Sequence, residues 1–263
     1  MSGAEETLAL VIDPPPGGEI LHQSDRATII WGDCRDPKVI AQVPREYGLL
    51  ATDPPYGIGY RSNWSKQFDQ LAGDDGSVDW PAVLGQWVGP DGTRSVGMAD
   101  KRHVMIFGYD SEALVKPLRL SATTELIWDK VIPGSGDVSS AWATSHEPIT
   151  FGVHFKRPSD RKDGRGALTA RLRRGSVIRW PRPNGVLRHP TEKPWQVMAQ
   201  LIESSTVWGD LVVDPCAGSG STGVAAVLEG RQCFLVEVDR DYADLCVRRV
   251  QAAERIADQI AAA

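Results

Sequence analysis

Seven short, continuously apolar runs rich in β-branched or aliphatic residues recur along the chain, and most of them end in polar, glycine or proline residues. Such runs are typical of strands buried on both faces of a sheet, and several of the intervening segments are long enough for crossover helices. The expected strands cover residues 27–33, 48–56, 103–108, 124–130, 148–155, 211–216 and 233–239. The pattern therefore predicts an α/β fold.

Apolar side chains at helical spacing predict two helices in the last third of the chain. The first is expected to begin after a cap at Thr191 and to end before Gly209. The second is expected from about Arg240 to Ile260. In both helices the apolar face is interpreted as core packing.

The 263 residues, 41% of them hydrophobic and 24% charged, have the composition of an ordered globular protein. Residues 1–24 contain a proline-rich turn and are expected to form a flexible arm, followed by one domain over residues 25–263. Residues 61–101 are expected to form a long functional loop with one short helix near residues 80–88. Residues 156–187 are expected to form a basic insert.

Several classes of protein are excluded by absent patterns. No apolar run approaches the roughly 20 residues that span a bilayer, and residues 1–20 lack the pattern of a signal peptide. The four cysteines and five histidines are widely scattered, so neither a disulfide framework nor a metal site is expected. We therefore expect a cytoplasmic protein without metal.

The distribution of charge is more informative than its total. A net charge of −5 argues by itself against a nucleic-acid partner. Residues 156–182, however, hold ten basic and two acidic side chains, a local charge of +8, which leaves −13 for the remainder. This stretch is either a solvated surface loop or a phosphate-binding strip whose affinity for DNA falls with salt.

Residues 218–223 (GSGSTG) match the GxGxxG pattern between an expected strand and a helix. Glycines let the backbone approach a ligand, and Glu237 at the end of the next strand can accept hydrogen bonds from ribose hydroxyls. Val224 stands where a Walker loop requires lysine. A purely structural turn and a dinucleotide-binding dehydrogenase remain alternatives. Asp214 favours a cationic ligand such as S-adenosylmethionine (SAM), because a carboxylate would repel a pyrophosphate.

The tetrapeptide Asp53-Pro54-Pro55-Tyr56 follows an expected strand, whereas the earlier proline turn at residues 13–16 lacks the aromatic residue and the strand. An edge strand ended by prolines is the structural alternative. An exocyclic amino group of adenine or cytosine is a poor nucleophile, and two acceptors can stabilise the positive charge that develops on it. The Asp53 carboxylate and the Pro54 carbonyl can serve as these acceptors. Tyr56 can stack on a flipped base.

With these features the chain resembles the circularly permuted, β-class-like, amino-methylating DNA methyltransferases of the DPPY type. The resemblance covers about residues 27–250 and includes TELIWDKVIPGSG, SHEPI, RHPTEKP, DPCAGSGSTG and FLVEVDRDY in one order. It implies a seven-stranded, mostly parallel, Rossmann-like class I methyltransferase fold. It also implies that residues 61–101 face the active site and DNA and that residues 156–187 recognise the target. A homodimer is compatible with the resemblance, and any partner restriction endonuclease is unknown.

The resemblance also implies roles for individual residues. The glycine turn surrounds the methionine part of SAM, Glu237 holds the ribose and Asp33 the adenine amino group, while Thr191 and Lys193 close over the methionine end. The implied cofactor-binding residues are Asp33, Asp53, Thr191, Lys193, Asp214, Cys216, Ala217, Gly218, Ser219, Gly220, Glu237 and Val238. The family often has phenylalanine at the position of Cys216. The implied catalytic residues are Asp53, Pro54, Pro55 and Tyr56.

An aspartate at the first tetrapeptide position favours adenine N6 over cytosine N4, within the restriction-modification class of DNA methylation. The expected DNA-binding residues are Trp64, Lys66, Arg171, Arg173, Arg174 and Arg179. His146 and Glu147 are left out of the catalytic set, since a core histidine explains them equally well. Methylation of cytosine N4, of RNA or of a protein glutamine, and a DNA-binding module without turnover, remain alternatives.

Overall fold

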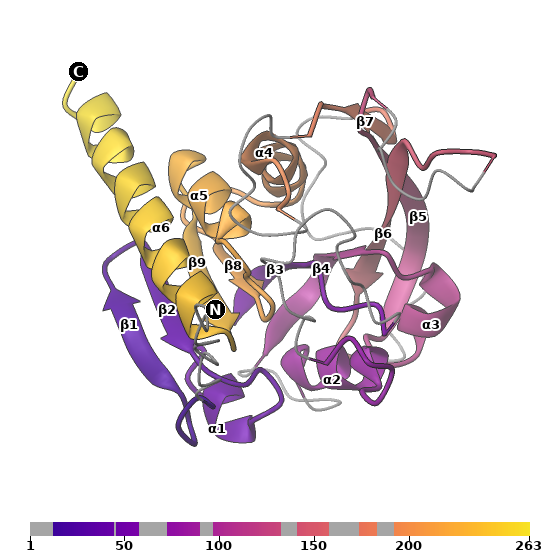
Figure 1. The fold of residues 1–263 in the computed structure, drawn as a ribbon, viewed down its shortest axis with the longest axis horizontal. Coiled ribbons are helices and arrows are strands. Elements are labelled where there is room, and N and C mark those ends of the chain that lie inside the picture. The colour runs from indigo at the N-terminus through magenta and orange to yellow at the C-terminus, as the bar shows by residue number, and fades with distance from the viewer. Residues whose placement is uncertain are drawn as a thin grey trace, which may run out of the picture.

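The computed structural model describes residues 13–44, 46–57, 73–89, 97–132, 141–157, 174–182 and 192–263 (Figure 1). Within these residues, nine strands form one sheet in the order β1-β2-β9-β8-β3-β4-β6-β5-β7. Their bounds are β1 Glu19–Gln23, β2 Ala27–Trp31, β3 Tyr47–Thr52, β4 Met98–Phe107, β5 Leu120–Asp129, β6 His146–His154, β7 Val177–Arg179, β8 Leu211–Asp214 and β9 Gln232–Glu237. Five of the eight neighbouring pairs in this part of the chain are parallel. The α/β class and the mostly parallel sheet are confirmed.

The sheet has two strands more than the seven predicted, β1 and β7, which form its two edges. The flexible-arm prediction is wrong for Glu19–Gln23, because these residues pair antiparallel with β2. β7 has three residues and lies inside the basic insert. Both strands are partly exposed, so neither has the continuous apolar run of a buried strand. The long loop also ends earlier than predicted, since β4 already begins at Met98.

The helices are α1 Pro37–Ile40, α2 Trp80–Trp87, α3 Ser111–Val115, α4 Trp195–Ser205, α5 Ser221–Leu228 and α6 Arg240–Ala261. The structure confirms the short helix near residues 80–88 and the long C-terminal helix. The cap predicted at Thr191 is wrong, because α4 begins after Pro194, whose backbone is extended and which makes no side-chain capping bond. A proline also disfavours helical backbone at the preceding residue, so the helix cannot start upstream.

Two apolar clusters cover the two faces of the sheet. One joins α4, α5 and α6 to the sheet, and the other joins α1, α2 and α3 to it (Figure 1). The alternation along β3 shows how one strand serves both layers: Leu49 and Ala51 belong to the first cluster and Leu50 to the second. The buried apolar runs in the sequence thus correspond to the central layer of a three-layer α/β/α domain.

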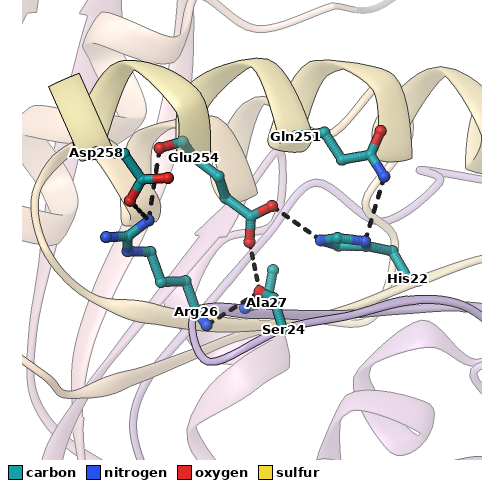
Figure 2. A network of polar contacts seen from close by, with 7 residues as sticks. All are labelled: His22, Ser24, Arg26, Ala27, Gln251, Glu254 and Asp258. Atoms are coloured by element: carbon teal, nitrogen blue, oxygen red, sulfur yellow. Dashed lines mark hydrogen bonds and ion pairs between the residues drawn. The ribbon is translucent and has the colours of Figure 1, made fainter.

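A polar network connects α6 to the N-terminal strand pair (Figure 2). Glu254 accepts a hydrogen bond from the Ser24 hydroxyl, and its carboxylate lies 3.0 Å from His22 Nε2. Arg26 lies 2.6 Å from Asp258. The last helix of the chain is therefore tied directly to its first two strands.

Candidate active site

The carboxyl ends of four strands bring the predicted cofactor and catalytic residues to one edge of the sheet. β2, β9, β8 and β3 are consecutive in the sheet, and each adjacent pair is parallel. Asp53 follows β3, Asp214 and Glu237 end β8 and β9, and Asp33 follows β2. Ligands of open α/β sheets bind at this edge.

Within the described residues, no group of three or more His, Cys, Asp or Glu is placed to hold a metal ion, and no helix has the length and apolarity to cross a membrane.

The glycine turn between β8 and α5 packs closely against α6 at the N-terminus of the helix α5. Gly220 caps α5 with φ +83°, and a Cβ atom there would lie 2.6 Å from Cys246 Sγ. Gly218 also has positive φ, and its N–H donates to Glu237 Oε2 at 2.7 Å. The Ala217 N–H donates to the Val236 carbonyl at 2.9 Å. The turn is therefore held by hydrogen bonds to β9, and its packing requires glycine at position 220.

Glu237 is a buried carboxylate in the position expected for ribose recognition. Its Oε1 accepts a hydrogen bond from the Asp239 N–H at 2.9 Å, in addition to the Gly218 bond on Oε2. Burial raises the pKa of Glu237 to about 7, although both backbone hydrogen bonds act in the opposite direction. Glu237 therefore changes charge near neutral pH.

Asp214 is also buried, and both its oxygens accept hydrogen bonds within the chain. The donors are the Thr222 hydroxyl at 2.5 Å and the Cys216 N–H at 3.1 Å. Burial raises the pKa of Asp214 to about 6, against the effect of the Thr222 bond. Each carboxylate oxygen can accept a second hydrogen bond, so Asp214 can still contact the ammonium group of SAM. That contact stays a prediction.

Three other residues that the resemblance implies for cofactor binding, Asp33, Cys216 and Val238, follow the strands β2, β8 and β9. Asp33 pairs with Arg35 at 2.7 Å. Burial acts to raise the pKa of Asp33, but the hydrogen bonds and the charge of Arg35 together outweigh it and lower that pKa. The Val238 carbonyl accepts a bond from the Trp31 indole at 2.9 Å. A hydrogen bond with the Cys34 thiol is the largest cause that raises the pKa of Cys216, and burial is the second. Cys216 is therefore a neutral thiol.

The tetrapeptide at the end of β3 forms an ordered cluster with residues that follow β4. The Tyr56 hydroxyl donates to Asp53 Oδ1. The Tyr56 ring lies edge-on to Tyr109, with centroids 6.0 Å apart, and the Tyr109 hydroxyl donates to the Pro55 carbonyl at 2.7 Å. Gly108, with φ +73°, leaves space for the Tyr56 ring. Tyr109 and Gly108 thus orient the tetrapeptide, although neither was a predicted site residue.

A chain of alternating charges crosses the site from Asp53. The Lys193 Nζ lies 2.6 Å from Asp53 Oδ2 and 2.9 Å from Glu147 Oε2, and the Lys130 Nζ lies 2.6 Å from Glu147 Oε1. β6 runs antiparallel to β4, so its first residues, including Glu147, lie at the carboxyl edge together with Lys130 after β5. Glu147 was not a predicted site residue, although its place at the start of a buried strand was a signal in the sequence.

Electrostatics keep Glu147 and Lys193 charged. Burial raises the pKa of Asp53 despite the neighbouring Lys193. Burial acts in the same direction on Glu147, but Lys193 and Lys130 outweigh it and lower the pKa of Glu147 to about 2. Burial lowers the pKa of Lys193, but Asp53 and Glu147 outweigh it and raise that pKa. The ammonium of Lys193 lies between two carboxylates, and its expected closure over the cofactor stays a prediction.

The predicted DNA-binding residues are only partly within the described chain. Trp64, Lys66, Arg171 and Arg173, like the cofactor residue Thr191, lie outside the described residues. Arg174 pairs with Glu203 of α4, and Arg179 lies 3.2 Å from Asp129. Their role in DNA binding stays a prediction.

Comparison with known proteins identifies the family. Residues 48–248 match the DNA methylase family of N6 and N4 methyltransferases. The chain belongs to this family. It is 39% identical over 224 residues to the type II methyltransferase M2.MboI of Moraxella bovis, which covers 76% of this chain and 79% of the relative. It is 34% identical over 257 residues to the DNA adenine methyltransferase YhdJ of Escherichia coli, covering 88% and 84%.

Solved structures support the fold. The M1.HpyAVI–SAM complex superimposes with a TM-score of 0.58 at 18% identity, covering 83% of this chain and 97% of that one. The cytosine-N4-specific PvuII DNA methyltransferase gives a TM-score of 0.63 at 14% identity, covering 94% and 96%. The prediction of a DNA methyltransferase with this fold is confirmed. The circular permutation and the role of the tetrapeptide stay predictions.

Proposed function

We propose that this methyltransferase transfers a methyl group from SAM directly to N6 of an adenine flipped out of duplex DNA. One observation carries the proposal: Asp53 and the glycine turn follow β3 and β8, which pair in parallel. The methyl acceptor and the cofactor can therefore meet at one edge of the sheet. Adenine is favoured by Asp53 at the first tetrapeptide position and by the adenine methyltransferase among the relatives.

The residues present fit SAM. The clash that a Cβ atom at Gly220 would make shows a closely packed turn, and the buried Glu237 carboxylate beside it suits ribose hydroxyls. Asp33 would accept from the adenine amino group of the cofactor, and the turn at residues 217–220 would hold the methionine part. When bound, SAM supplies a methyl group on a positively charged sulfur.

The tetrapeptide then acts on the target amino group. Asp53 and the Pro54 carbonyl would accept the two amino hydrogens and favour a tetrahedral nitrogen. The nitrogen would form a bond to the methyl carbon as the carbon–sulfur bond breaks, which leaves S-adenosylhomocysteine as a neutral thioether. The methylated nitrogen would then lose one proton to water. The Asp53 carboxylate would stabilise the positive charge on the nitrogen before the proton leaves. The Tyr56 hydroxyl holds that carboxylate through a hydrogen bond.

The arrangement of the chain supports the permuted class. The tetrapeptide precedes the glycine turn, and α6 contacts β1 and β2, so the last element lies beside the first ones. The seven strands between the edge strands β1 and β7 would be those of the class I methyltransferase sheet. The basic residues 156–187 and the loop at residues 61–101 would face DNA. The protein could also form a homodimer, which light scattering would detect.

Incubation with labelled SAM and unmethylated DNA, RNA or protein tests the function. The expected product is N6-methyladenine in DNA, and Asp53→Ala should reduce its formation at least about 100-fold. N4-methylcytosine, label in RNA or protein, or no label with retained DNA binding would each support one alternative and contradict the proposal.

A further inference from the structure

The carboxylate proposed to hold the target amino group already has a cation at one oxygen. The Lys193 Nζ lies 2.6 Å from Asp53 Oδ2, while the Tyr56 hydroxyl donates to Oδ1. An ammonium is a compact group with three N–H donors. Because an amino group would bind an oxygen at a similar distance, about 2.9 Å, Lys193 occupies the place of the methyl acceptor at Oδ2.

Glu147 offers this ammonium a second position. Its Oε2 lies 2.9 Å from the same Nζ atom, yet the oxygen is buried and accepts no aligned hydrogen bond within the described residues. Lys130 holds the other oxygen at 2.6 Å, so the Glu147 carboxylate is fixed in place. Burial alone would favour a neutral Glu147, but the two lysines lower its pKa to about 2, so it is ionised and able to receive Lys193.

We propose that Glu147 is a positioning residue that takes over Lys193 when the amino group of the flipped base displaces the ammonium from Asp53. The proposal rests on the function proposed above, since it requires a substrate with an amino group. A small movement of Lys193 frees Oδ2 while the ammonium keeps Glu147 as its partner, so that Lys193 is not left as an unpaired buried charge, which would be costly. It also removes a cation from the carboxylate at which positive charge develops during transfer.

Glu147→Gln tests this role because it keeps the shape and removes the charge. Lys193 then has Asp53 as its remaining carboxylate and competes with the target, so KM for DNA should rise at least about tenfold, while the Kd for SAM changes less than about threefold. Glu147→Asp should restore KM in part.

A matched control uses a second carboxylate paired with a buried lysine. Glu46 pairs with Lys156 at the amino end of β3, away from the site. Glu46→Gln makes the same chemical change and should leave KM for DNA and kcat as in the wild type. An unchanged KM for DNA in Glu147→Gln would overturn the proposal. Weaker SAM binding and a lower melting temperature in that variant, without a rise in KM, would also overturn it.

A crystal structure of the wild-type enzyme with duplex DNA and a SAM analogue that carries an amine in place of the sulfonium provides a test without variants. The target amino group should occupy Asp53 Oδ2, and the Lys193 Nζ should contact Glu147 alone. A bound base beside an unmoved Lys193 contradicts the proposal. If the wild type methylates no amino group at all, the proposed function fails; if it does and Glu147→Gln is normal, only this inference fails.

Discussion

Tyr56 reaches Asp53 because residue 108 has no side chain. Gly108 follows β4 with φ +73°, and a Cβ atom there would lie 2.0 Å from Tyr56 Cε1. The position therefore requires glycine both for its backbone conformation and for the space that the ring needs. A residue outside the tetrapeptide thus controls the orientation of the proposed catalytic carboxylate.

Gly108→Ala is expected to displace the Tyr56 ring and break its bond to Asp53. Methyl transfer should fall about 10- to 100-fold, because the acceptor carboxylate loses its orientation. The matched control is Gly209→Ala, since Gly209 has φ +77° but nothing within 4 Å of its Cβ position. That variant should lose about 1 kcal/mol of stability and keep its activity. Equal losses of activity in both variants would refute the role of Gly108.

Glu237 predicts how cofactor binding depends on pH. Its folded pKa of about 7 exceeds the ordinary 4.5, so the protonated form is favoured in the free protein, and the stability that it contributes falls as pH rises from 4.5 to about 7. Ribose hydroxyls bind best to the ionised carboxylate. The affinity for SAM should therefore weaken as pH falls below about 7.

Calorimetric titration of SAM at several pH values measures this effect. In the wild type, binding below the pKa should release a proton from Glu237, detected as a dependence of the heat on the buffer. Glu237→Gln should bind more weakly at high pH and lose that part of the proton release. A wild-type affinity that stays constant across this range would contradict the assignment.

At the scale of elements, α6 supports the glycine turn. Arg249 of α6 donates to the Ser219 carbonyl at 2.8 Å and to its hydroxyl at 2.6 Å, and it pairs with Glu192 at 3.0 Å. Glu192 directly precedes Lys193. One side chain of the helix thus connects the proposed cofactor turn to the segment that carries the lysine of the catalytic site.

Arg249→Met should loosen the turn while keeping the aliphatic part of the side chain. We expect the Kd for SAM to rise about tenfold, in line with the loss of a charge-assisted hydrogen bond. Arg248→Met is the control, since Arg248 is the exposed neighbour on the same helix. Equal Kd values in the two variants, measured by calorimetry, would show that Arg249 does not support the turn.

At the scale of the whole molecule, the network around Glu254 joins the two ends of the described chain (Figure 2). Glu254 contacts both His22 and Ser24, while Ser24 also accepts a hydrogen bond from the Ala27 N–H at 3.0 Å. The edge strand β1 has mostly exposed or half-buried residues, so apolar burial contributes little to its attachment. Polar contacts with α6 are therefore expected to stabilise this edge.

Glu254→Ala should lower the free energy of unfolding by about 1–2 kcal/mol, because it removes hydrogen bonds of partly buried groups. Arg255→Ala changes the exposed neighbour and should have little effect on stability. Both variants should keep methyl transfer, since the network lies away from Asp53. Thermal unfolding measures the difference, and equal melting temperatures would contradict the role of the network.

The strands that were predicted from the sequence are those that are buried on both faces by the protein. Strands buried on both faces have continuous apolar runs, so the seven strands between the edges were predicted. β1 and β7 contact both solvent and protein, and their mixed composition has no periodic signal. The start of α4 depended on the geometry of Pro194 rather than on a capping side chain at Thr191.

For the site, the sequence by itself determined the glycine turn and the tetrapeptide at residues 53–56, because each is local and its chemistry depends on adjacent residues. Only the tertiary structure decided that Lys193 lies between Asp53 and Glu147. These side chains come from β3, β6 and the segment before α4, and the order of strands in the sheet brings them together. A charge pair between distant segments leaves no pattern along the chain, since its energy depends on distance and burial in space.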